Sequence, residues 1–408
     1  MSRLFIRALT LLPLALPLYL IRFKIGPLPT TFLEIILLAL FVGFSVQYRW
    51  SGWKSGWKRL GSWRWPVIAW LVVTLFEVYI SPSILAGFGL WRAYILEPLL
   101  VFVMLAGSIH DEKDARALRR SLFATVLFLV LWATIQFATG KGIPHPYDVA
   151  ISAGRRATGP YSFPNALSLF VTPIGTWAFC LWLEDRRRLL SLVTALGALV
   201  GIALARSNGG AIAFSIVAII ALVISFARKT DRGLPRVWSG SIVGALAVAS
   251  AVVFARSAWR AKLLAVLSFH EWSGKVRLVM WKETWEMLKT HWFFGAGFGG
   301  YPIMFAPFHK ATYIEIFQYP HNILFNFWSE TGILGVLVFV WIIVTWIRSA
   351  ARNSFLVPRS LFLKLAPLLA ILIHGLVDVP YFKNDLAIVF WMLIFLTTFV
   401  FKTEKTET

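Results

Sequence analysis

Cysteine is nearly absent from this sequence of 408 residues, and charged residues are scarce. The single cysteine, Cys180, excludes an intrachain disulfide and a zinc site built from cysteines. Charged residues make up 14% of the chain, whereas soluble domains carry roughly 25%. Hydrophobic residues make up 58%, in runs long enough to cross a hydrocarbon layer about 30 Å thick. This composition excludes a water-soluble globular enzyme and indicates an integral membrane protein.

The apolar runs predict an all-α, polytopic membrane protein with about twelve transmembrane helices. Because neither a repeat of fixed period nor a low-complexity linker is visible, residues 1–408 are predicted to form a single membrane domain. Residues 256–320, between the ninth and tenth spans, are predicted to form a large extracytoplasmic loop. The predicted spans are residues 4–21, 31–48, 66–80, 91–109, 121–139, 164–183, 189–205, 210–227, 237–255, 321–347, 361–378 and 386–401.

Acidic residues are few, with 19 Asp and Glu against 40 Lys and Arg. A net charge of +21 is compatible with nucleic-acid binding, but the basic residues lie mostly between the spans. If the N-terminus is cytoplasmic, loops on that side hold 22 Lys and Arg, and short loops on the opposite side hold 7. The positive-inside rule therefore predicts that both termini are cytoplasmic. We predict no nucleic-acid partner.

The long loop contains a helical pattern followed by a run of glycines. Trp281, Trp285, Leu288 and Trp292 recur at steps of four, three and four, which predicts an amphipathic helix lying along the outer membrane interface. A helix that merely anchors the loop would give the same pattern. Residues 295–300 match the dinucleotide fingerprint GxGxxG formally, but no strand precedes them. We interpret them as a flexible turn that ends the helix.

Ionisable residues within the spans gather toward the predicted outer face, although each is expensive to place in hydrocarbon. Arg92 begins a span there, and His374 and Asp378 share a helix face near the outer end of the eleventh span. Their distribution predicts a polar cavity that opens outward, while any single pair could instead be an internal salt bridge. The other ionisable residues with this distribution are Glu34, Glu77, Glu97, Arg206 and His321.

Four segments together resemble the O-antigen ligase and O-antigen polymerase superfamily, across roughly residues 150–345. The family's short loop between two spans usually reads serine then arginine, whereas here Arg206 precedes Ser207. Whether Arg206 does the work of the family arginine is therefore open. The four segments are RRATGP with FPNA at 155–160 and 163–166, RSNGG at 206–210, Arg277 with Trp281 and FGAG at 294–297, and His321-Asn322 with Leu324, Glu330, Gly332, Leu334 and Gly335.

The resemblance implies a polyprenol-dependent glycosyltransferase of surface polysaccharide biosynthesis in a bacterial cytoplasmic (inner) membrane. Such an enzyme transfers a glycan from undecaprenyl diphosphate to a hydroxyl of a lipid- or glycan-linked acceptor, with its active site facing the periplasm or exterior. A polysaccharide polymerase of the same superfamily is an alternative, and the related protein oligosaccharyltransferases use yet another acceptor. A lipid-linked oligosaccharide transporter or flippase is the alternative from another class. Membrane lipid is a further expected partner.

The residue types in these segments suit that chemistry. Guanidinium groups form bidentate hydrogen bonds with phosphate and stabilise the charge of a leaving diphosphate, which favours Arg277 and Arg206, with Arg156 third. His321 is the candidate base for the acceptor hydroxyl, because imidazole titrates in the useful range. A cap or interface role is the alternative for this histidine. The remaining substrate-binding candidates are Asn165, Asn322, Glu330, Arg92 and Asp378.

Three further expectations concern metal ions and supporting contacts. No paired acidic motif occurs in an outer loop, so we predict a reaction that needs neither metal ion nor cofactor. His374 and Asp378 are spaced so that both could bind one metal ion. We expect them instead to hydrogen-bond to each other or to Asn384 and Asp385. Asn322 or Glu330 is expected to orient the His321 ring or line the cavity, and Asn165 to begin a helix after Pro164.

Overall fold

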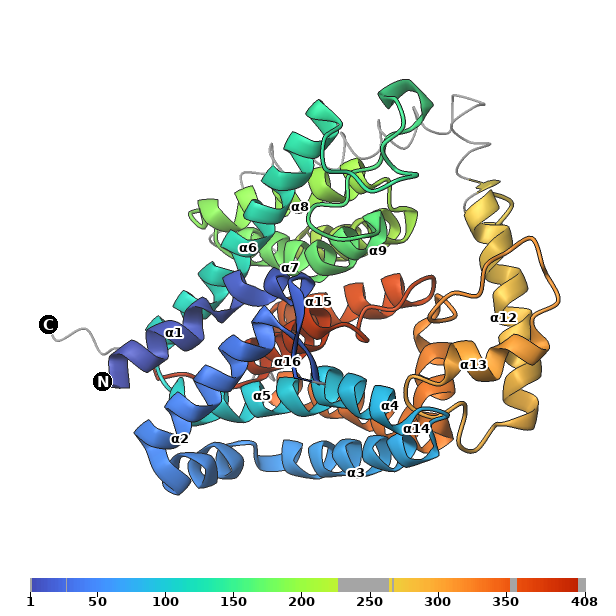
Figure 1. The fold of residues 1–408 in the computed structure, drawn as a ribbon. Coiled ribbons are helices and arrows are strands. Elements are labelled where there is room, and N and C mark those ends of the chain that lie inside the picture. The colour runs from blue at the N-terminus through green and yellow to red at the C-terminus, as the bar shows by residue number, and fades with distance from the viewer. Residues whose placement is uncertain (1, 27, 227–263, 266–267, 353–357, 403–408) are drawn as a thin grey trace, which may run out of the picture.

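The protein is a bundle of long helices with a looped region at one end (Figure 1). The computed structural model describes residues 2–26, 28–226, 264–265, 268–352 and 358–402. Within this part of the chain the bundle helices are α1 (Ser2–Ala15), η1 (Leu16–Leu20), α2 (Phe32–Arg59), η2 (Gly61–Trp63), α3 (Arg64–Ile80), α4 (Ile84–Trp91), η3 (Arg92–Leu96), α5 (Glu97–Ser108), α6 (Glu112–Thr139), α7 (Pro164–Glu184), α8 (Leu189–Ala205), α9 (Asn208–Phe226), α14 (Ile323–Arg352), α15 (Pro358–Gly375) and α16 (Asn384–Thr398).

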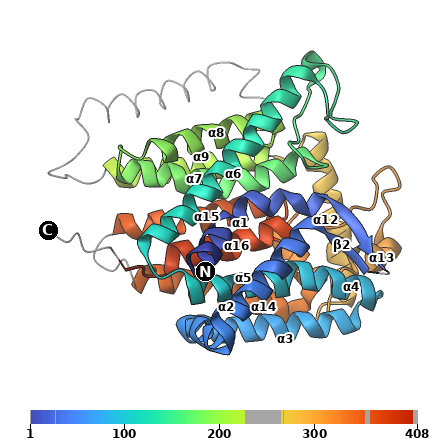
Figure 2. The ribbon, with the colours of Figure 1, turned by 60° about the vertical axis from the view of Figure 1, so that its left-hand side comes forward.

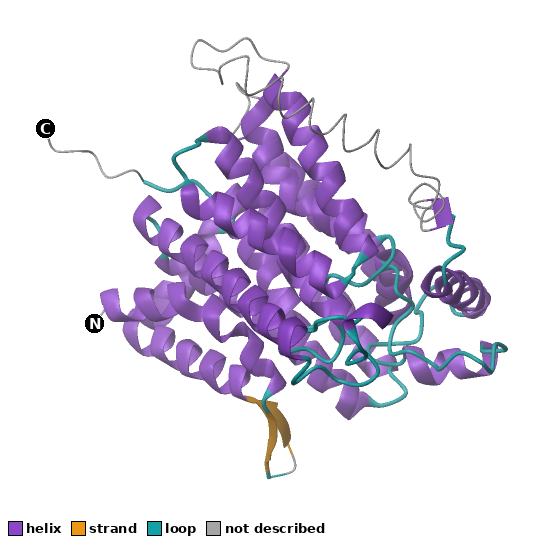
Figure 3. Cartoon of the chain, turned by 90° about the horizontal axis from the view of Figure 1, so that it is seen from above, coloured by secondary structure: helices purple, strands orange, loops and turns teal. Residues whose placement is uncertain are grey.

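Helices occupy eleven of the twelve predicted spans. Eight helical stretches are long and apolar enough to cross a membrane, and three shorter apolar helices cover residues 189–205, 360–375 and 384–398. The ninth predicted span, 237–255, lies outside the described residues, so the count of twelve stays a prediction. The structure therefore confirms a polytopic helical membrane protein. One small departure is an antiparallel hairpin of β1 (Arg22–Ile25) and β2 (Leu28–Thr31), which projects from the helices (Figure 3).

Two helices form the centre of the bundle because they are apolar on all sides. Helix α7 packs against α8, α9 and α15, and 89% of the residues in its most apolar stretch are buried. Helix α16 packs mainly against α5 and is buried over nearly its whole length. Helices α1, α2, α3 and α6 lie around them and expose many large apolar side chains, which suits contact with lipid.

A π-helical turn, η3, is explained by the proline that follows it. Pro98 has no backbone N–H, so the carbonyl of Tyr94, four residues earlier, loses its helical partner. The hydroxyl of Tyr381 donates to this carbonyl at 3.1 Å. The indole N–H groups of Trp70 and Trp391 donate to the same hydroxyl oxygen, each at 3.3 Å. One buried tyrosine therefore joins α3, η3 and α16.

The described part of the long loop folds into α12 (Trp272–Thr290), α13 (Tyr301–Phe305) and η5 (Ala306–Phe308). Figure 2 places α12, α13 and β2 toward one end of the bundle, away from the start of α1. The predicted helix is confirmed, whereas its position along the outer membrane interface stays a prediction. On the predicted face Trp285 is 43% exposed and Leu288 is fully buried, and Trp292 lies beyond the end of α12.

Glu283, on the same helix, is buried as well. Its carboxylate accepts hydrogen bonds from the backbone N–H groups of Lys310 and Ala311, at 2.9 and 3.1 Å. It also pairs with His309 Nδ1 at 2.9 Å. Burial alone lowers the pKa of His309, but its bonds with Glu283 and the Ile314 carbonyl outweigh that effect and raise the pKa. This buried pair fixes the end of the loop to α12.

The glycine run at 295–300 is a tightly packed turn, which corrects the expectation of a flexible one. Gly295, Gly297 and Gly299 have φ between 66° and 75°, a region that favours glycine. The turn is held from two sides, since Phe298 N–H donates to the Glu77 carbonyl at 3.0 Å and Gly299 N–H donates to the Glu330 carboxylate. The glycine run therefore packs between α3 and α14 and is hydrogen-bonded to both.

Helix α14 bends where it contacts the loop that contains this glycine run. Gly332 has φ 59° and ψ −174° inside the helix, a conformation essentially restricted to glycine. The Ile333 N–H next to it donates to the Phe293 carbonyl at 3.0 Å instead of continuing the helical pattern. A Cβ on Gly332 would overlap with that same carbonyl oxygen.

We expect Gly332→Ala to lower the free energy of unfolding by roughly 1–3 kcal/mol, because alanine cannot adopt this backbone conformation without strain. Thermal unfolding in detergent measures the change. Gly89→Ala is the matched control, since Gly89 is helical and its Cβ would meet open space. An unfolding temperature for Gly332→Ala equal to that of the control would contradict this account of the bend.

Candidate functional site

Two polar cavities lie side by side at the end of the bundle that carries α12. The first, of about 290 Å³, is lined by Tyr19, Tyr94, Tyr147, Tyr161 and Tyr319 among others, and we name it the tyrosine cavity. The second, of about 300 Å³, is lined by Arg156, Arg206 and Arg277, and we name it the arginine cavity. The two cavities share the wall residues Arg156, Asn165 and Asp378.

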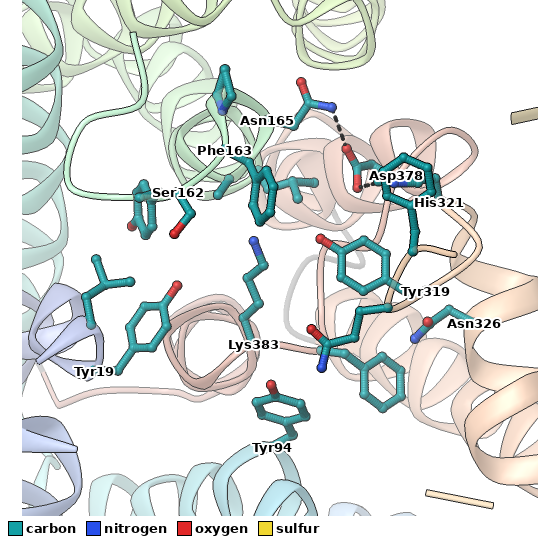
Figure 4. A pocket seen from close by; sticks show the side chains of 18 of the residues that line it. Tyr19, Tyr94, Ser162, Phe163, Asn165, Tyr319, His321, Asn326, Asp378 and Lys383 are labelled. Carbon is teal, nitrogen blue, oxygen red and sulfur yellow. Dashed lines mark hydrogen bonds and ion pairs between the residues drawn. The ribbon is translucent and has the colours of Figure 1, made fainter. Parts of the chain in front are cut away.

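A chain of hydrogen bonds runs along this shared wall. Arg156 Nη2 donates to Asn165 Oδ1 at 3.0 Å, and Asn165 Nδ2 donates to Asp378 Oδ2 at 2.9 Å. Asp378 Oδ1 then lies 3.3 Å from Nδ1 of His321. Figure 4 shows Asn165, Asp378 and His321 in this order at the edge of the tyrosine cavity. Hydrogen bonds therefore link four side chains from three separate parts of the chain.

The backbone at His321 is held in an unusual conformation. His321 has φ 49°, in the left-handed region that non-glycine residues rarely adopt. Asn322 then caps α14, because its Oδ1 accepts from the N–H groups of Leu324 and Phe325, and its Nδ2 donates to the Leu376 carbonyl at 2.9 Å. Such strain is maintained only when the surroundings determine it. Here the cap on α14 fixes the backbone next to His321.

Aromatic side chains orient the imidazole ring from the other direction. The rings of Phe317 and Tyr319 meet the His321 ring edge-on, with centroids 5.2 and 5.0 Å away. The ring is thus held by two aromatic contacts and the bond to Asp378 Oδ1. Its Nε2 is the nitrogen that remains for a substrate. Burial raises the pKa of the nearby Tyr319, and the charge of Asp378 raises it further, so this hydroxyl stays protonated.

Asp378 lies just beyond the end of α15 and is 2% exposed. Burial opposes its ionisation, but the hydrogen bond from His321 and the charges of His321, His374 and Arg277 prevail and hold its pKa well below the usual range. The Val379 N–H also donates to Oδ1 at 2.9 Å. An ionised carboxylate accepts a hydrogen bond from an Nδ1–H group. In a neutral imidazole with its proton on Nδ1, Nε2 is the atom that can accept a proton.

The arginine cavity is built from turns between helices. Arg206 ends α8 with φ 49°, and Gly154 leaves room for it, since a Cβ there would lie 2.7 Å from Arg206 Nη1. The Nε of Arg277 on α12 donates to the Val377 carbonyl at 2.7 Å. Arg156 Nε donates to the Ala205 carbonyl at 2.9 Å. Carbonyl contacts therefore fix the positions of Arg156 and Arg277.

The charges in this cavity favour an anion. Burial lowers the pKa of Arg156, and the positive charges of Arg277 and Arg206 lower it further, because like charges are gathered there. Two carboxylates also line the cavity, but Asp378 is engaged with Asn165 and His321, and Glu271 accepts from Asn208 at 2.9 Å. The guanidinium groups therefore exceed the carboxylates that face them.

Several predicted residues have roles that differ from the expected ones. Neither Asn322 nor Glu330 contacts the His321 ring through a hydrogen bond among the described residues; Asp378 does. Glu330 lines the tyrosine cavity, which is one of the two roles expected for it, and it also holds the glycine turn. Asn165 follows Pro164 at the start of α7 as expected, but its amide binds Arg156 and Asp378 and does not cap the helix.

The expected pairing of His374 with Asp378 is replaced by the bond between Asp378 and His321. Helix α15 ends at Gly375, before Asp378, so the two residues do not share a helical face as predicted. His374 is 2% exposed and lines the arginine cavity. Gly209 allows α9 to approach this ring, because a Cβ there would lie 2.8 Å from His374 Cδ2. This close approach accounts for one glycine of the RSNGG segment.

Arg92 lines neither cavity. It pairs with Glu34 at 2.7 Å and with Glu97 at 3.4 Å, so it forms the interhelical ion cluster that was the alternative interpretation of such pairs. This cluster lies in the wall of a third, mostly apolar cavity of about 390 Å³. The structure therefore does not bring Arg92 together with His321 or the other arginines.

Sequence reasoning missed most of the tyrosine cavity. Its tyrosines come from η1, η3 and three loop segments, so no spacing in the sequence connects them. Lys383 also lines it, and burial lowers the pKa of this lysine. Asn326 is the lining residue that the sequence could have revealed. A polar residue within a transmembrane span costs free energy to insert and is often functional. Among the described residues, no group of three or more His, Cys, Asp or Glu side chains could hold a metal ion.

These features define a multi-pass membrane protein with a charged site at one end of its helices. Residues 176–340 match the family model described as O-antigen ligase, whereas no curated protein matches the chain. The match confirms the resemblance to the O-antigen ligase superfamily and supports a membrane enzyme of the O-antigen ligase or polymerase type, with lipid-linked glycan and acceptor substrates. The matched residues include Arg206, Arg277 and His321, while Arg156 and Asp378 lie outside them.

We expect inorganic pyrophosphate to bind the purified protein at the arginine cavity and to bind more weakly as salt rises. Arg277→Ala should weaken this binding at least about tenfold, the scale of one charge-assisted hydrogen bond. Isothermal titration calorimetry measures it. Arg116→Ala on α6 is the control, because Arg116 is exposed and lines neither cavity. Equal weakening in both variants would show that the anion binds elsewhere.

Proposed function

We propose that this protein transfers a glycan from undecaprenyl diphosphate to a hydroxyl group of a second, membrane-held acceptor, at the extracytoplasmic face of a bacterial inner membrane. The observation that carries the proposal is the common wall of the two cavities. A cavity with three arginines meets a cavity that holds a histidine, and the chain from Arg156 through Asn165 and Asp378 to His321 connects them. Anion binding and proton removal are thereby adjacent.

The proposed step has one bond formed, one broken and one proton moved. The acceptor oxygen bonds to the anomeric carbon of the donor sugar while its proton passes to Nε2 of His321. The bond between that carbon and the diphosphate oxygen breaks, and the diphosphate leaves with the electron pair. Asp378, 3.3 Å from Nδ1, stabilises the imidazolium that forms. Arg206 and Arg277, with Arg156, stabilise the charge on the leaving group.

The order of residues at the short loop bears on this assignment. Arg206 precedes Ser207, unlike the family pattern, but its left-handed backbone turns the chain at the end of α8 and lets it line the arginine cavity. This geometry supports Arg206 as the equivalent of the family arginine. The cytoplasmic location of both termini rests on the distribution of basic residues between loops.

We expect His321→Ala to reduce the turnover of glycan transfer by about 10²–10⁴-fold, because general base catalysis contributes this much. Asp378→Asn should cost a similar factor, since an asparagine amide can donate to Nδ1 and favour the tautomer whose Nε2 carries a proton. The measurement is the transfer of radiolabelled glycan from its diphosphate carrier to an acceptor in liposomes. Wild-type turnover in either variant would remove that residue from the mechanism.

Arg277→Ala should reduce turnover by about 10²–10³-fold, and Arg277→Lys should restore little, because an ammonium group cannot reproduce the planar fork of a guanidinium. The control is Cys180→Ala, a fully buried position outside both cavities, which should be silent. The same vesicles distinguish an enzyme from a transporter. Movement of the carrier across the membrane without any new glycosidic bond would contradict the proposal.

We also expect transfer to proceed without a divalent metal ion, because the arginines are positioned to neutralise the leaving diphosphate in place of one. Purified protein treated with a chelator should retain full transfer activity. The control is the same protein with magnesium or manganese added back after chelation. Loss of transfer with chelator, followed by recovery with either metal, would contradict this part of the proposal.

A further inference from the structure

The buried side-chain amide of Asn326 lacks a hydrogen-bond partner among the described residues. It lies on α14, is 1% exposed and lines the tyrosine cavity. Neither its Oδ1 nor its Nδ2 has a partner among the described residues. Figure 4 shows the side chain directed into the cavity from the side of α14. Because buried polar groups are nearly always hydrogen-bonded, this amide has capacity for a ligand that supplies both an acceptor and a donor.

The walls around Asn326 are aromatic. Five tyrosines line the cavity, and Phe382 adds another ring. Tyr161 is already engaged, because its hydroxyl donates to Asp385 at 2.9 Å, so it offers mainly its ring face. Aromatic walls with a few convergent polar groups are typical of small-molecule sites. A pyranose ring suits such walls, since its C–H face is apolar and its edge carries hydroxyl groups.

The charges in the tyrosine cavity are balanced, unlike those in the arginine cavity. Arg22, Arg156 and Lys383 face it together with Glu315, Glu330 and Asp378. The Glu330 carboxylate accepts from the glycine turn, and Asp378 is bonded to His321 and Asn165. The volume of about 290 Å³ is near the lower limit of ligand pockets, which run from roughly 300 to 1,000 Å³. The cavity therefore suits a small uncharged ligand.

We propose that the tyrosine cavity binds the terminal, uncharged sugar ring of the acceptor, and that the Asn326 amide recognises two adjacent hydroxyl groups on it. One hydroxyl accepts from Nδ2 and the other donates to Oδ1. This inference rests on the proposed function, which assigns the diphosphate to the arginine cavity. His321 lines the tyrosine cavity and not the arginine cavity. The hydroxyl that gives its proton to His321 therefore arrives from the side of Asn326.

Binding of simple sugars tests the subsite without catalysis. The probes are the methyl glycosides of glucose, galactose, mannose and N-acetylglucosamine, together with their monodeoxy analogues, measured by saturation-transfer NMR. We expect at least one to bind the wild-type protein and to bind about tenfold more weakly to Asn326→Leu. Removing one recognised hydroxyl should weaken binding to the wild-type protein by a similar factor and have little further effect on the variant.

Ser329→Ala is the matched control for Asn326→Leu. Ser329 lies on the same helix, is fully buried, and its hydroxyl also has no partner among the described residues, but it lines neither cavity. Glycoside binding should be unchanged in this control. If Asn326→Leu binds every glycoside as the wild-type protein does, or if no glycoside binds the wild-type protein at all, the proposal is overturned.

The kinetics of glycan transfer test the acceptor subsite independently of the proposed function. We expect Asn326→Leu to raise the KM for the acceptor about tenfold and to leave the KM for the donor unchanged. A rise in the donor KM alone would overturn the assignment to the acceptor. If the wild-type protein transfers no glycan, the proposed function fails, while the glycoside titration still decides whether this cavity binds sugar.

Thermal unfolding tests whether Asn326 instead serves to stabilise the fold. Asn326→Leu removes a buried amide that forms no hydrogen bond within the described protein, so the unfolding temperature should stay equal or rise. A structural asparagine would give the opposite result. A lower unfolding temperature together with an unchanged acceptor KM would make Asn326 a packing residue and overturn the proposal.

Discussion

The buried carboxylate of Asp378 is the contact on which the site depends. It binds Asn165 at the start of α7 and His321 before α14, and it lies just after α15, so it joins three segments distant in the chain. A buried carboxylate requires such partners, because an unpaired charge there would be costly. The same bonds that satisfy Asp378 also orient the imidazole and, through Asn165, hold Arg156. Stability and chemistry thus rely on one group.

The loop and the bundle are fastened by backbone contacts rather than by apolar burial alone. The glycine turn inserts between α3 and α14, and Gly332 permits α14 to bend around it. Close approach of two backbones requires residues without a Cβ, which explains why glycines gather at both places. Since Asn322 caps α14 and directly follows His321, the bend and the cap together position the candidate base relative to α12 and its arginine.

Composition and hydropathy were sufficient to predict the membrane class and the locations of eleven helices, because crossing a bilayer requires long apolar runs. The resemblance carried by four short segments brought out His321, Arg206 and Arg277 as candidates. One expectation about local structure was wrong. The tight packing of the glycine turn depends on which elements contact it, and hydrophobic spacing does not contain that information.

The sequence by itself determined the lipid environment, the helical class and the kinds of side chain available at one end of the bundle. It did so because solvent and backbone hydrogen bonding constrain each segment separately. Only the tertiary structure decided which of those side chains meet. It paired His321 with Asp378 instead of Asn322 or Glu330, kept Arg92 with its two glutamates, and enclosed Asn326 among tyrosines. These are contacts between distant segments, and packing selects them.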